Sequence, residues 1–373
     1  MMMKQRDYLK QVTRIVLKVG SSLLADAQHG INTTMVQRLA SDIKALHDKD
    51  IQVCLVSSGA VALGRVQLGW LDKKLNVHEK QAAAAIGQPL LMHAYQKAFS
   101  ELGMVVAQML LTKDDLRHRR RYINASNTSK TLFNAQVVPI VNENDTVVVE
   151  EIKFGDNDSL GALVSTVVEA DLMVMMTDVD GLFETNPAED AAAKRVSVVN
   201  TLTSDVMNMA GDAGSSFGTG GMKSKLDAAK ISVQSGVMSA IIHGEKDGEL
   251  TKLLAGEDVG TLFTCGSDRH SWHEHWITNL LPVSGKLMLK KSANTSDSVM
   301  LEHIQSFEGQ FDKGECVEVW NQGVLVARGL TNYNSDDMYK LLGKHTKDIE
   351  NTLGYVDFKS MVHQDNLVML NKR

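Results

Sequence analysis

The sequence predicts an α/β protein: a three-layer αβα sandwich with a mainly parallel sheet, followed by a small β-rich domain. Short apolar runs alternate with longer helical patterns over the first two thirds of the chain, as is typical of a parallel sheet. The apolar runs are mostly continuous rather than alternating, which indicates strands buried on both faces. Beyond Pro282 the pattern changes to short runs separated by glycines, which indicates a second domain.

The strands of the main sheet are predicted where short apolar runs occur. In chain order they are Arg14–Val19, Ile51–Val56, Val105–Leu111, Val137–Val141, Leu172–Met176 and Ala240–His243. Helices are predicted between them where apolar residues recur every three or four positions, as they do from Met35 to Leu46. These helices are Thr34–Asp48, the alanine-rich Glu79–Leu102, Ser159–Glu169 and Lys223–Gln234.

The β-rich domain is predicted from four further short runs. They are Lys286–Leu289, Cys316–Trp320, Val324–Arg328 and Leu367–Leu370. A polar, histidine-rich stretch, Cys265–Asn279, separates these runs from the main sheet. We therefore expect one domain over residues 1–264, a linker over 265–281 and a β-rich domain over 282–373. A chain of 373 residues fits two domains at roughly 150 residues each.

The composition excludes several classes of protein. With 43% hydrophobic and 23% charged residues, the chain is neither disordered nor a coiled-coil rod. A net charge of −6 argues against a protein whose main task is to bind nucleic acid. The three cysteines, Cys54, Cys265 and Cys316, lie far apart, which argues against a disulfide framework. No run approaches the ~18 apolar residues of a membrane span, and the N-terminus lacks an apolar signal core, so we expect a cytoplasmic protein.

Two glycine-containing turns close the first two predicted strands. Lys18–Ser22 (KVGSS) follows the first strand, and Ser57–Ala60 (SSGA) follows the second and opens a helix. Glycine allows close approach of the backbone to an anion, and a lysine beside exposed amides forms a phosphate cradle. The start of a helix also favours negative ligand groups. Taken singly, each turn is equally well explained as a tight strand-to-helix connection.

Two polar clusters follow. Asn142–Asp145 comes directly after a buried strand, which indicates a polar pocket rather than packing. Gly155–Ser159 precedes a predicted helix, and we expect Asp158 to cap it. A calcium-binding loop is excluded because Val167 occupies the twelfth position, where such a loop needs Glu.

The last two clusters are Thr177–Gly181 and Gly218–Lys225. The second has three glycines and two lysines at a helix start, which is the strongest phosphate-binding signal in the chain, although a flexible loop is the alternative. The P-loop motif G-x-x-x-x-G-K-[ST] is absent from the chain. The dinucleotide-binding motif G-x-G-x-x-G is absent as well, because Lys223 stands where its third glycine would be. These clusters therefore predict phosphate binding by lysines and backbone amides on a parallel sheet.

The order and spacing of these motifs resemble the glutamate 5-kinases of the amino acid kinase family, and the C-terminal part resembles a PUA domain. The resemblance implies ATP- and Mg²⁺-dependent phosphorylation of the side-chain carboxylate of L-glutamate, the first step of proline synthesis. It also implies inhibition by proline and assembly into homodimers or homotetramers. Because the acyl phosphate product hydrolyses readily, it further implies a functional partner, glutamyl phosphate reductase.

The resemblance also implies roles for individual residues. It places Lys18 and Lys225 at the transferred phosphoryl group and makes Asp158 the carboxylate that holds both lysines. The glutamate-binding positions are matched by Ser58, Asp145 and Asn157, with Asn142 and Asp156 as neighbours. The ATP-binding positions are matched by Lys18, Gly20, Ser21, Thr177, Asp178, Thr219, Gly220, Gly221, Met222, Lys223, Ser224 and Lys225. No metal ligands are expected from the protein itself.

Two features depart from the family pattern. The basic cluster Arg117–Arg121 is either an RNA or anion patch or, in the simpler interpretation, a solvated helix start near a subunit contact. Cys265, His270, His273 and His275 are either metal ligands or part of the linker, and their spacing matches no standard zinc site.

Two other functions are alternatives to glutamate phosphorylation. One is another amino acid kinase, such as an acetylglutamate or aspartate kinase, against which the PUA-like tail and Gly155–Asp158 argue. The other is an RNA-binding PUA protein with a decayed kinase domain. That alternative predicts loss of the two lysines or of Asp158, which are all present. It also predicts a basic tail, but residues 283–373 hold 11 Lys and Arg against 12 Asp and Glu, a net of −1.

Overall fold

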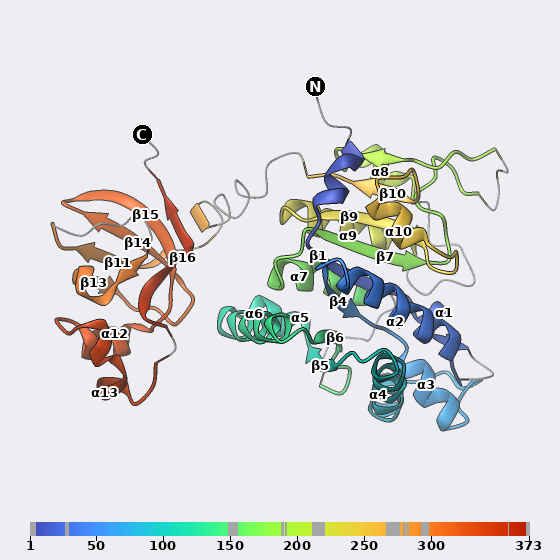
Figure 1. The fold of residues 1–373 in the computed structure, drawn as a ribbon, viewed down its shortest axis with the longest axis horizontal. Coiled ribbons are helices and arrows are strands. Elements are labelled where there is room, and N and C mark those ends of the chain that lie inside the picture. Colours follow the sequence, from blue (N-terminus) through green and yellow to red (C-terminus); the bar gives the residue numbers. More distant parts are fainter. Residues whose placement is uncertain are drawn as a thin grey trace. The chain divides into compact units, whose positions relative to one another are not determined.

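The computed structural model describes residues 5–26, 30–147, 156–187, 190, 192–210, 221–265, 277–278, 281, 283–291, 298–356 and 358–370. Its contacts divide the chain into two compact units, a larger one made mainly of residues up to 266 and a smaller one from 267 onward (Figure 1). Among the described helices, none is long and apolar enough to cross a membrane.

The larger unit is built on an eight-stranded sheet with the strand order β5-β6-β4-β1-β7-β9-β10-β8. The strands are β1 Arg14–Val19, β4 Gln52–Val56, β5 Val106–Leu111, β6 Val138–Glu143, β7 Leu172–Thr177, β8 Val198–Val199, β9 Met238–His243 and β10 Thr261–Phe263. All paired neighbours are parallel except β9 and β10. The predicted mainly parallel sheet is therefore confirmed, and all six predicted strands are present.

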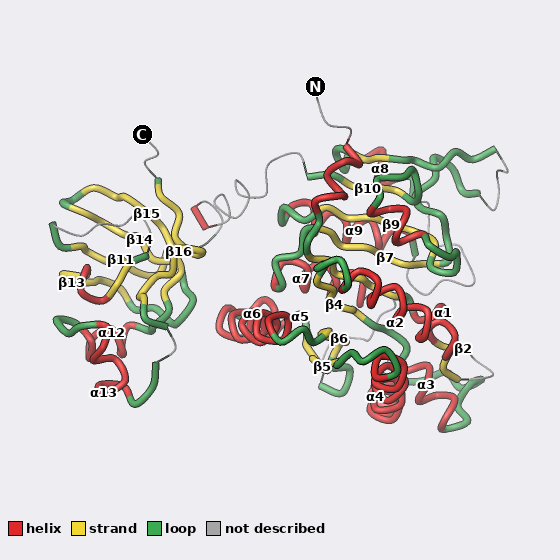
Figure 2. The backbone as a smooth tube through the Cα atoms, viewed as in Figure 1, coloured by secondary structure: helices red, strands yellow, loops and turns green. Residues whose placement is uncertain are grey.

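Helices cover both faces of this sheet (Figure 2). They are α1 Ser21–Leu24, α2 Thr33–His47, α3 Ala60–Gln67, α4 Val77–Ser100, α5 Lys113–Arg117, α6 Arg119–Asn134, α7 Asp156–Val167, α8 Ser204–Asn208, α9 Met222–Gln234 and α10 Glu249–Leu254. A 3-10 helix over Gln5–Gln11 precedes β1, and a two-stranded ribbon joins β2, Ala25–Asp26, to β3, Gly30–Ile31. The four predicted helices correspond to α2, α4, α7 and α9.

The side chains of β1 alternate between two layers. Ile15, Leu17 and Val19 belong to one buried cluster with the apolar residues of α2 and α4. Lys18 points to the other face, because a Cβ placed on Gly161 of α7 would lie 3.5 Å from the Cβ of Lys18. The lysine that ends the central strand therefore lies under α7 rather than in the main apolar core.

The backbones of helices α3 and α4 lie unusually close together where the helices cross. A Cβ added at Gly64 would lie 1.8 Å from the carbonyl oxygen of Ala83, and one added at Gly87 would lie 1.8 Å from that of Ala60. Only glycine permits this contact between the two backbones. The start of α3, which directly follows the Ser57–Ala60 turn, is thus seated against the middle of α4.

The smaller unit is β-rich, as predicted. Its six-stranded sheet has the order β12-β16-β15-β14-β11-β13. The strands are β11 Val283–Leu289, β12 Val299–Met300, β13 Ile304–Gly309, β14 Cys316–Asn321, β15 Val324–Thr331 and β16 Ser360–Met369. Two short helices, α12 Ser335–Leu341 and α13 Ile349–Leu353, lie between β15 and β16, and their apolar residues join the core of this sheet.

Candidate active site

The centre of the candidate site is one carboxylate between two lysines. Lys18 Nζ lies 2.5 Å from Asp158 Oδ1, and Lys225 Nζ lies 3.5 Å from Asp158 Oδ2. All three side chains are buried, with 6%, 0% and 7% exposure for Lys18, Asp158 and Lys225. Ser224 Oγ donates a 2.8 Å hydrogen bond to Asp158 Oδ2. The structure thus brings together the three residues that the resemblance to the kinases singled out.

Each member of this triad comes from a different element. Lys18 lies near the carboxyl end of β1, Asp158 in the first turn of α7, and Lys225 in the first turn of α9. Helices α7 and α9 pack on each other, which brings their first turns together over the end of β1. The prediction that Asp158 caps its helix is wrong: α7 already begins at Asp156, so Asp158 is inside the helix and its carboxylate binds the lysines.

The charges in the triad are coupled. Burial alone would raise the pKa of Asp158, but Lys18 and Lys225 outweigh it, so this pKa lies below its ordinary value. Burial lowers the pKa of Lys225, and the charge of Lys18 adds to this, while Asp158 opposes it. Asp158 is therefore ionised at neutral pH, and its one negative charge faces two ammonium groups.

A cluster of amide and hydroxyl side chains, which we call the amide cluster, lies next to the triad. Asn157, the neighbour of Asp158, donates from Nδ2 to Ser58 Oγ at 2.8 Å, to the Ser57 carbonyl at 3.1 Å and to Asn142 Oδ1 at 3.2 Å. These contacts join the ends of β4 and β6 to the start of α7. The left-handed conformation of Gly59, with φ of 102°, ends the turn that carries Ser58 and starts α3.

The oxygen of the same amide is unsatisfied. Asn157 Oδ1 is buried and has no hydrogen-bond partner among the described residues. A buried acceptor without a donor is costly, and in a site it indicates the position of a ligand donor. The amide cluster is therefore suited to a ligand that carries an N–H or ammonium group.

Other predicted residues surround this centre. The backbone N–H of Gly20 donates to the Met176 carbonyl at 3.3 Å, which places the first turn beside the end of β7. Thr177 Oγ1 donates to Asp178 Oδ1 at 2.9 Å, and Asp178 acts electrostatically on Lys225. Ser21 begins α1. These residues lie at the edge of the sheet where the strands end, which is the edge that binds ligands in parallel α/β sheets.

The structure describes the remaining predicted residues to different extents. Gly221 precedes α9 as its N-cap, Met222 and Lys223 form its first turn, and Asp145 is half-buried after β6. For Asp156 the structure describes the backbone at the start of α7 but not the side chain. Thr219 and Gly220 lie outside the described residues.

Two residues of the site were not predicted. Gln88 of α4 accepts a 2.7 Å hydrogen bond from Asn142 Nδ2, and the hydroxyl of Tyr95 lies 2.9 Å from Ser57 Oγ. Both come from the long alanine-rich helix, whose sequence carries no motif that points to a site. Gln88 could have been found only as a polar residue next to a run of small ones.

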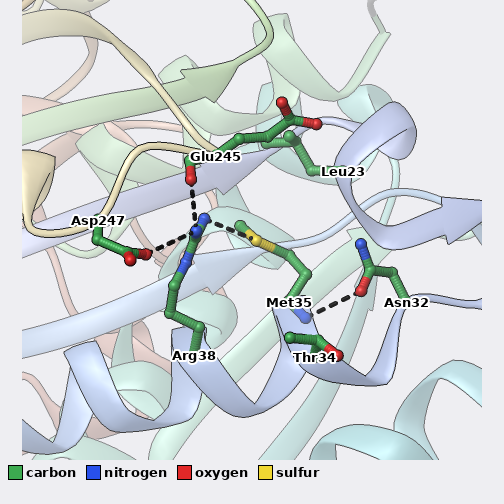
Figure 3. A pocket seen from close by; sticks show the side chains of 7 residues that line it. All are labelled: Leu23, Asn32, Thr34, Met35, Arg38, Glu245 and Asp247. Atoms are coloured by element: carbon green, nitrogen blue, oxygen red, sulfur yellow. Dashed lines mark hydrogen bonds and ion pairs between the residues drawn. The ribbon is translucent and has the colours of Figure 1, made fainter.

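The structure holds a separate pocket near the end of β9, seen in Figure 3. It is lined by Leu23, Asn32, Thr34, Met35, Arg38, Glu245 and Asp247, none of which is a predicted site residue. Arg38 spans it, donating from Nη1 to the Glu245 carbonyl at 2.7 Å and from Nη2 to the Gly244 carbonyl, and pairing with Asp247 at 3.2 Å. Arg38 therefore links α2 to the loop after β9, and we call this set of contacts the Arg38 clasp.

The described residues offer no cluster of metal ligands. No group of three or more His, Cys, Asp or Glu in this part of the chain could hold a metal ion. Cys265 is free and half-buried, and burial raises its pKa to about 12. His270, His273 and His275 lie outside the described residues. The cluster Arg117–Arg121 spans the end of α5 and the start of α6, and the side chains of Arg117 and Arg119 are not described.

Comparisons with known proteins show the family to which the chain belongs. Residues 13–244 match the amino acid kinase family, and residues 285–353 match the PUA domain. A glutamate 5-kinase from Geobacter sulfurreducens is 44% identical over 368 residues, which cover 97% of this chain and 99% of the relative. The glutamate 5-kinase from Syntrophotalea carbinolica is 43% identical over 371 residues, which cover 98% of this chain and 99% of the relative. The one from Caldanaerobacter subterraneus is 43% identical over 365 residues, which cover 96% of this chain and 98% of the relative. The resemblance seen in the sequence is confirmed.

Proposed function

The chain belongs to the glutamate 5-kinases of the amino acid kinase family, and on that premise we propose that Lys18, Asp158 and Lys225 carry its reaction. The reaction is the ATP-dependent phosphorylation of L-glutamate in proline biosynthesis. The observation that supports the proposed roles is the geometry of the triad: two buried lysines held by one buried carboxylate where the central strand ends.

The chemical difficulty is that both reactants are anions. The side-chain carboxylate of glutamate is ionised at neutral pH, so no base is needed to activate it. One of its oxygens forms a bond to the γ-phosphorus of ATP while the bond from that phosphorus to the β–γ bridging oxygen breaks, and ADP leaves. Such a transfer depends on in-line positioning and on neutralising the phosphoryl oxygens.

The triad suits the second requirement, the neutralisation of charge. Lys18 and Lys225 together carry two positive charges, and Asp158 carries one negative charge. One positive charge therefore remains to neutralise the phosphoryl group. Asp158 keeps the two ammonium groups from separating, and Ser224 orients its carboxylate through a 2.8 Å hydrogen bond. Because all three side chains are buried, these charges act in a medium of lower dielectric constant than water, where they are stronger.

Glutamate is proposed to bind at the amide cluster. The unsatisfied Asn157 Oδ1 accepts a hydrogen bond from its α-ammonium group, and the hydroxyl of Ser58 and the side chain of Asn142 complete the wall. Asp145 and Asp156 supply negative charge near the same ammonium group. This places the side-chain carboxylate of glutamate toward the triad, since Asn157 and Asp158 are adjacent in α7.

ATP is proposed to bind across the ends of β1 and β7 and the start of α9. Among the described residues, Gly20, Ser21, Thr177, Asp178 and residues 221–225 surround this region, and the resemblance adds Thr219 and Gly220. The residues present fit a Mg²⁺ ion that is bound chiefly through the phosphate oxygens, because Asp158 is already held by two lysines and the described residues offer no carboxylate cluster. When bound, the ion would neutralise charge on the β- and γ-phosphates.

Several further properties are proposed from the resemblance. They are inhibition by proline at or near the glutamate site, assembly as a homodimer or homotetramer, delivery of the product to glutamyl phosphate reductase, and action in the cytoplasm. We also keep the domain boundaries at 1–264 and 282–373, with a linker over 265–281. The near-neutral charge of the PUA domain supports a structural or regulatory role for it rather than RNA binding.

The test is to trap the acyl phosphate as its hydroxamate. Purified protein is mixed with magnesium ATP, hydroxylamine and L-glutamate, with L-aspartate and N-acetylglutamate in parallel. We expect colour with L-glutamate alone, its loss in Lys225→Ala, and its retention in Lys230→Ala, which removes an exposed lysine of the same helix. No product from folded wild-type protein with any substrate would overturn the proposal and favour the RNA-binding alternative.

A further inference from the structure

We propose that Gln88 is a positioning residue for glutamate. It fixes the amide of Asn142 and, through it, helps to fix the amide of Asn157, so that Asn157 presents its oxygen to the substrate. Gln88 belongs to α4, which contributes none of the residues that the motifs indicated. The inference rests on the proposed function, because it assigns a role in binding the substrate of that reaction.

A continuous chain of hydrogen bonds carries the inference. Gln88 Nε2 donates to Gln108 Oε1 of β5 at 3.2 Å, and Gln88 Oε1 accepts from Asn142 Nδ2 at 2.7 Å. Asn142 Oδ1 in turn accepts from the backbone N–H of Glu143 at 2.9 Å and from Asn157 Nδ2 at 3.2 Å. The chain runs from the half-exposed surface of α4 to the residue next to Asp158.

The direction of this chain is set at Asn142, where a backbone N–H donates to the amide oxygen. An amide side chain has one accepting oxygen and one donating nitrogen, so reversing it exchanges the two. If the amide of Asn142 were reversed, its nitrogen would face two donors, the Glu143 N–H and Asn157 Nδ2, and its oxygen would face the oxygen of Gln88. The Glu143 N–H therefore sets the orientation of the Asn142 amide, and Gln88 Oε1 holds its Nδ2 in place by accepting the 2.7 Å hydrogen bond.

The orientation of the Asn142 amide determines how Asn157 is hydrogen-bonded. Its nitrogen is fully engaged by three acceptors, the Ser57 carbonyl, Ser58 Oγ and Asn142 Oδ1. Its oxygen is buried without a hydrogen-bond partner among the described residues. A ligand that supplies a donor at this point relieves the cost of burial, whereas a ligand without one leaves it in place. The network thus selects for the ammonium group of an amino acid.

The packing of α4 explains why Gln88 can reach Asn142. Its neighbour Gly87 touches the backbone of Ala60, to the point that a Cβ there would lie 1.8 Å from the Ala60 carbonyl oxygen. Ala60 follows directly on Ser58 and Gly59, the turn that Asn157 binds. The same close contact therefore seats the substrate turn and brings the next residue of α4 to the end of β6.

The experiment measures steady-state kinetics of Gln88→Met by the hydroxamate assay. Met has a similar size and favours helices, but it cannot accept the hydrogen bond from Asn142. We expect the KM for L-glutamate to rise about 5- to 10-fold, the size expected for one lost hydrogen bond, with the KM for ATP within about twofold of wild type. The matched control is Gln96→Met, which changes an exposed glutamine of the same helix and should leave both constants unchanged.

A double-mutant cycle separates positioning from a general loss of structure. If Gln88 acts through Asn142, adding Gln88→Met to Asn142→Ala should change the KM for glutamate by less than about twofold. Full additivity, an equal rise in the KM for ATP, or no effect of Gln88→Met would each overturn the inference. If Gln88→Met unfolds, Gln88→Ala must give the same rise. Inactive wild-type protein would instead contradict the proposed function.

Discussion

Lys18 Nζ lies 2.5 Å from Asp158 Oδ1, and both side chains are buried. Burying a single charge is costly, so a buried lysine at the end of a central strand needs a partner. Here the partner is shared, because Asp158 also binds Lys225 through its second oxygen. The site therefore holds two lysines around a single carboxylate, which suits the proposed reaction between two anions, and we expect Asp158 to matter for both stability and turnover.

The first prediction concerns Asp158→Asn, which keeps the shape of the side chain but removes its charge. Two buried lysines then face each other without compensation. Breaking a buried ion pair in this way costs about 3–5 kcal/mol of stability, and we expect turnover to fall by at least about 100-fold. Hydroxamate kinetics and urea unfolding measure the two effects. Asp227→Asn, at an exposed position of α9, is the control, and an equal loss there would contradict the specific role of Asp158.

The second prediction is a dependence of stability on pH. The lysines hold the pKa of Asp158 below its ordinary value, so between the two values the unfolded chain binds more protons than the folded one. The stabilisation is complete above about pH 4, the ordinary pKa, and is lost as pH falls through the lowered native pKa. Urea unfolding between pH 3 and pH 6, at steps of about half a unit, should show a steeper loss for wild type than for Asp158→Asn. Parallel curves would contradict the prediction.

The sequence was sufficient for the sheet but not for the whole site. Continuous apolar runs located β1, β4 and β7, because strands buried on both faces leave an unbroken signal. The short β8 and β10, of two and three residues, were not predicted, since so few residues carry no pattern. The local rule that Asp precedes a helix misplaced Asp158, because the two lysines that bind it come from distant parts of the chain.

Gln88 shows what a motif cannot reveal. Its partners Gln108 and Asn142 are 20 and 54 residues away and become neighbours only through the crossing of α3 and α4 and the pairing of β5 with β6. The resemblance to known kinases supplied the triad because its motifs are contiguous. A residue that acts through a tertiary contact needs the structure.

The third prediction concerns the clasp made by Arg38. This side chain joins α2 to the loop after β9 through the carbonyls of Gly244 and Glu245 and the carboxylate of Asp247. We expect Arg38→Met to lower the free energy of unfolding by about 1.5–3 kcal/mol, the range for a hydrogen bond to a charged group. Lys49→Met, at an exposed position, is the control for removing a positive charge. Equal unfolding curves for the two variants would show that the clasp contributes nothing.

The fourth prediction tests the close crossing of α3 and α4. Gly87→Ala would place a Cβ 1.8 Å from the Ala60 carbonyl oxygen, so the two helices must separate. Overpacking of this kind costs about 1–3 kcal/mol, and we expect a matching loss in urea unfolding even though alanine favours helices. The KM for L-glutamate should rise as well, because the shift moves both the Ser58 turn and Gln88 away from Asn142 and Asn157. Ala85→Met adds more bulk to an exposed position of the same helix and should alter neither quantity. If Gly87→Ala lost stability while its KM for glutamate stayed at the wild-type value, the crossing would support the fold alone, and the link from α4 to the substrate would be wrong.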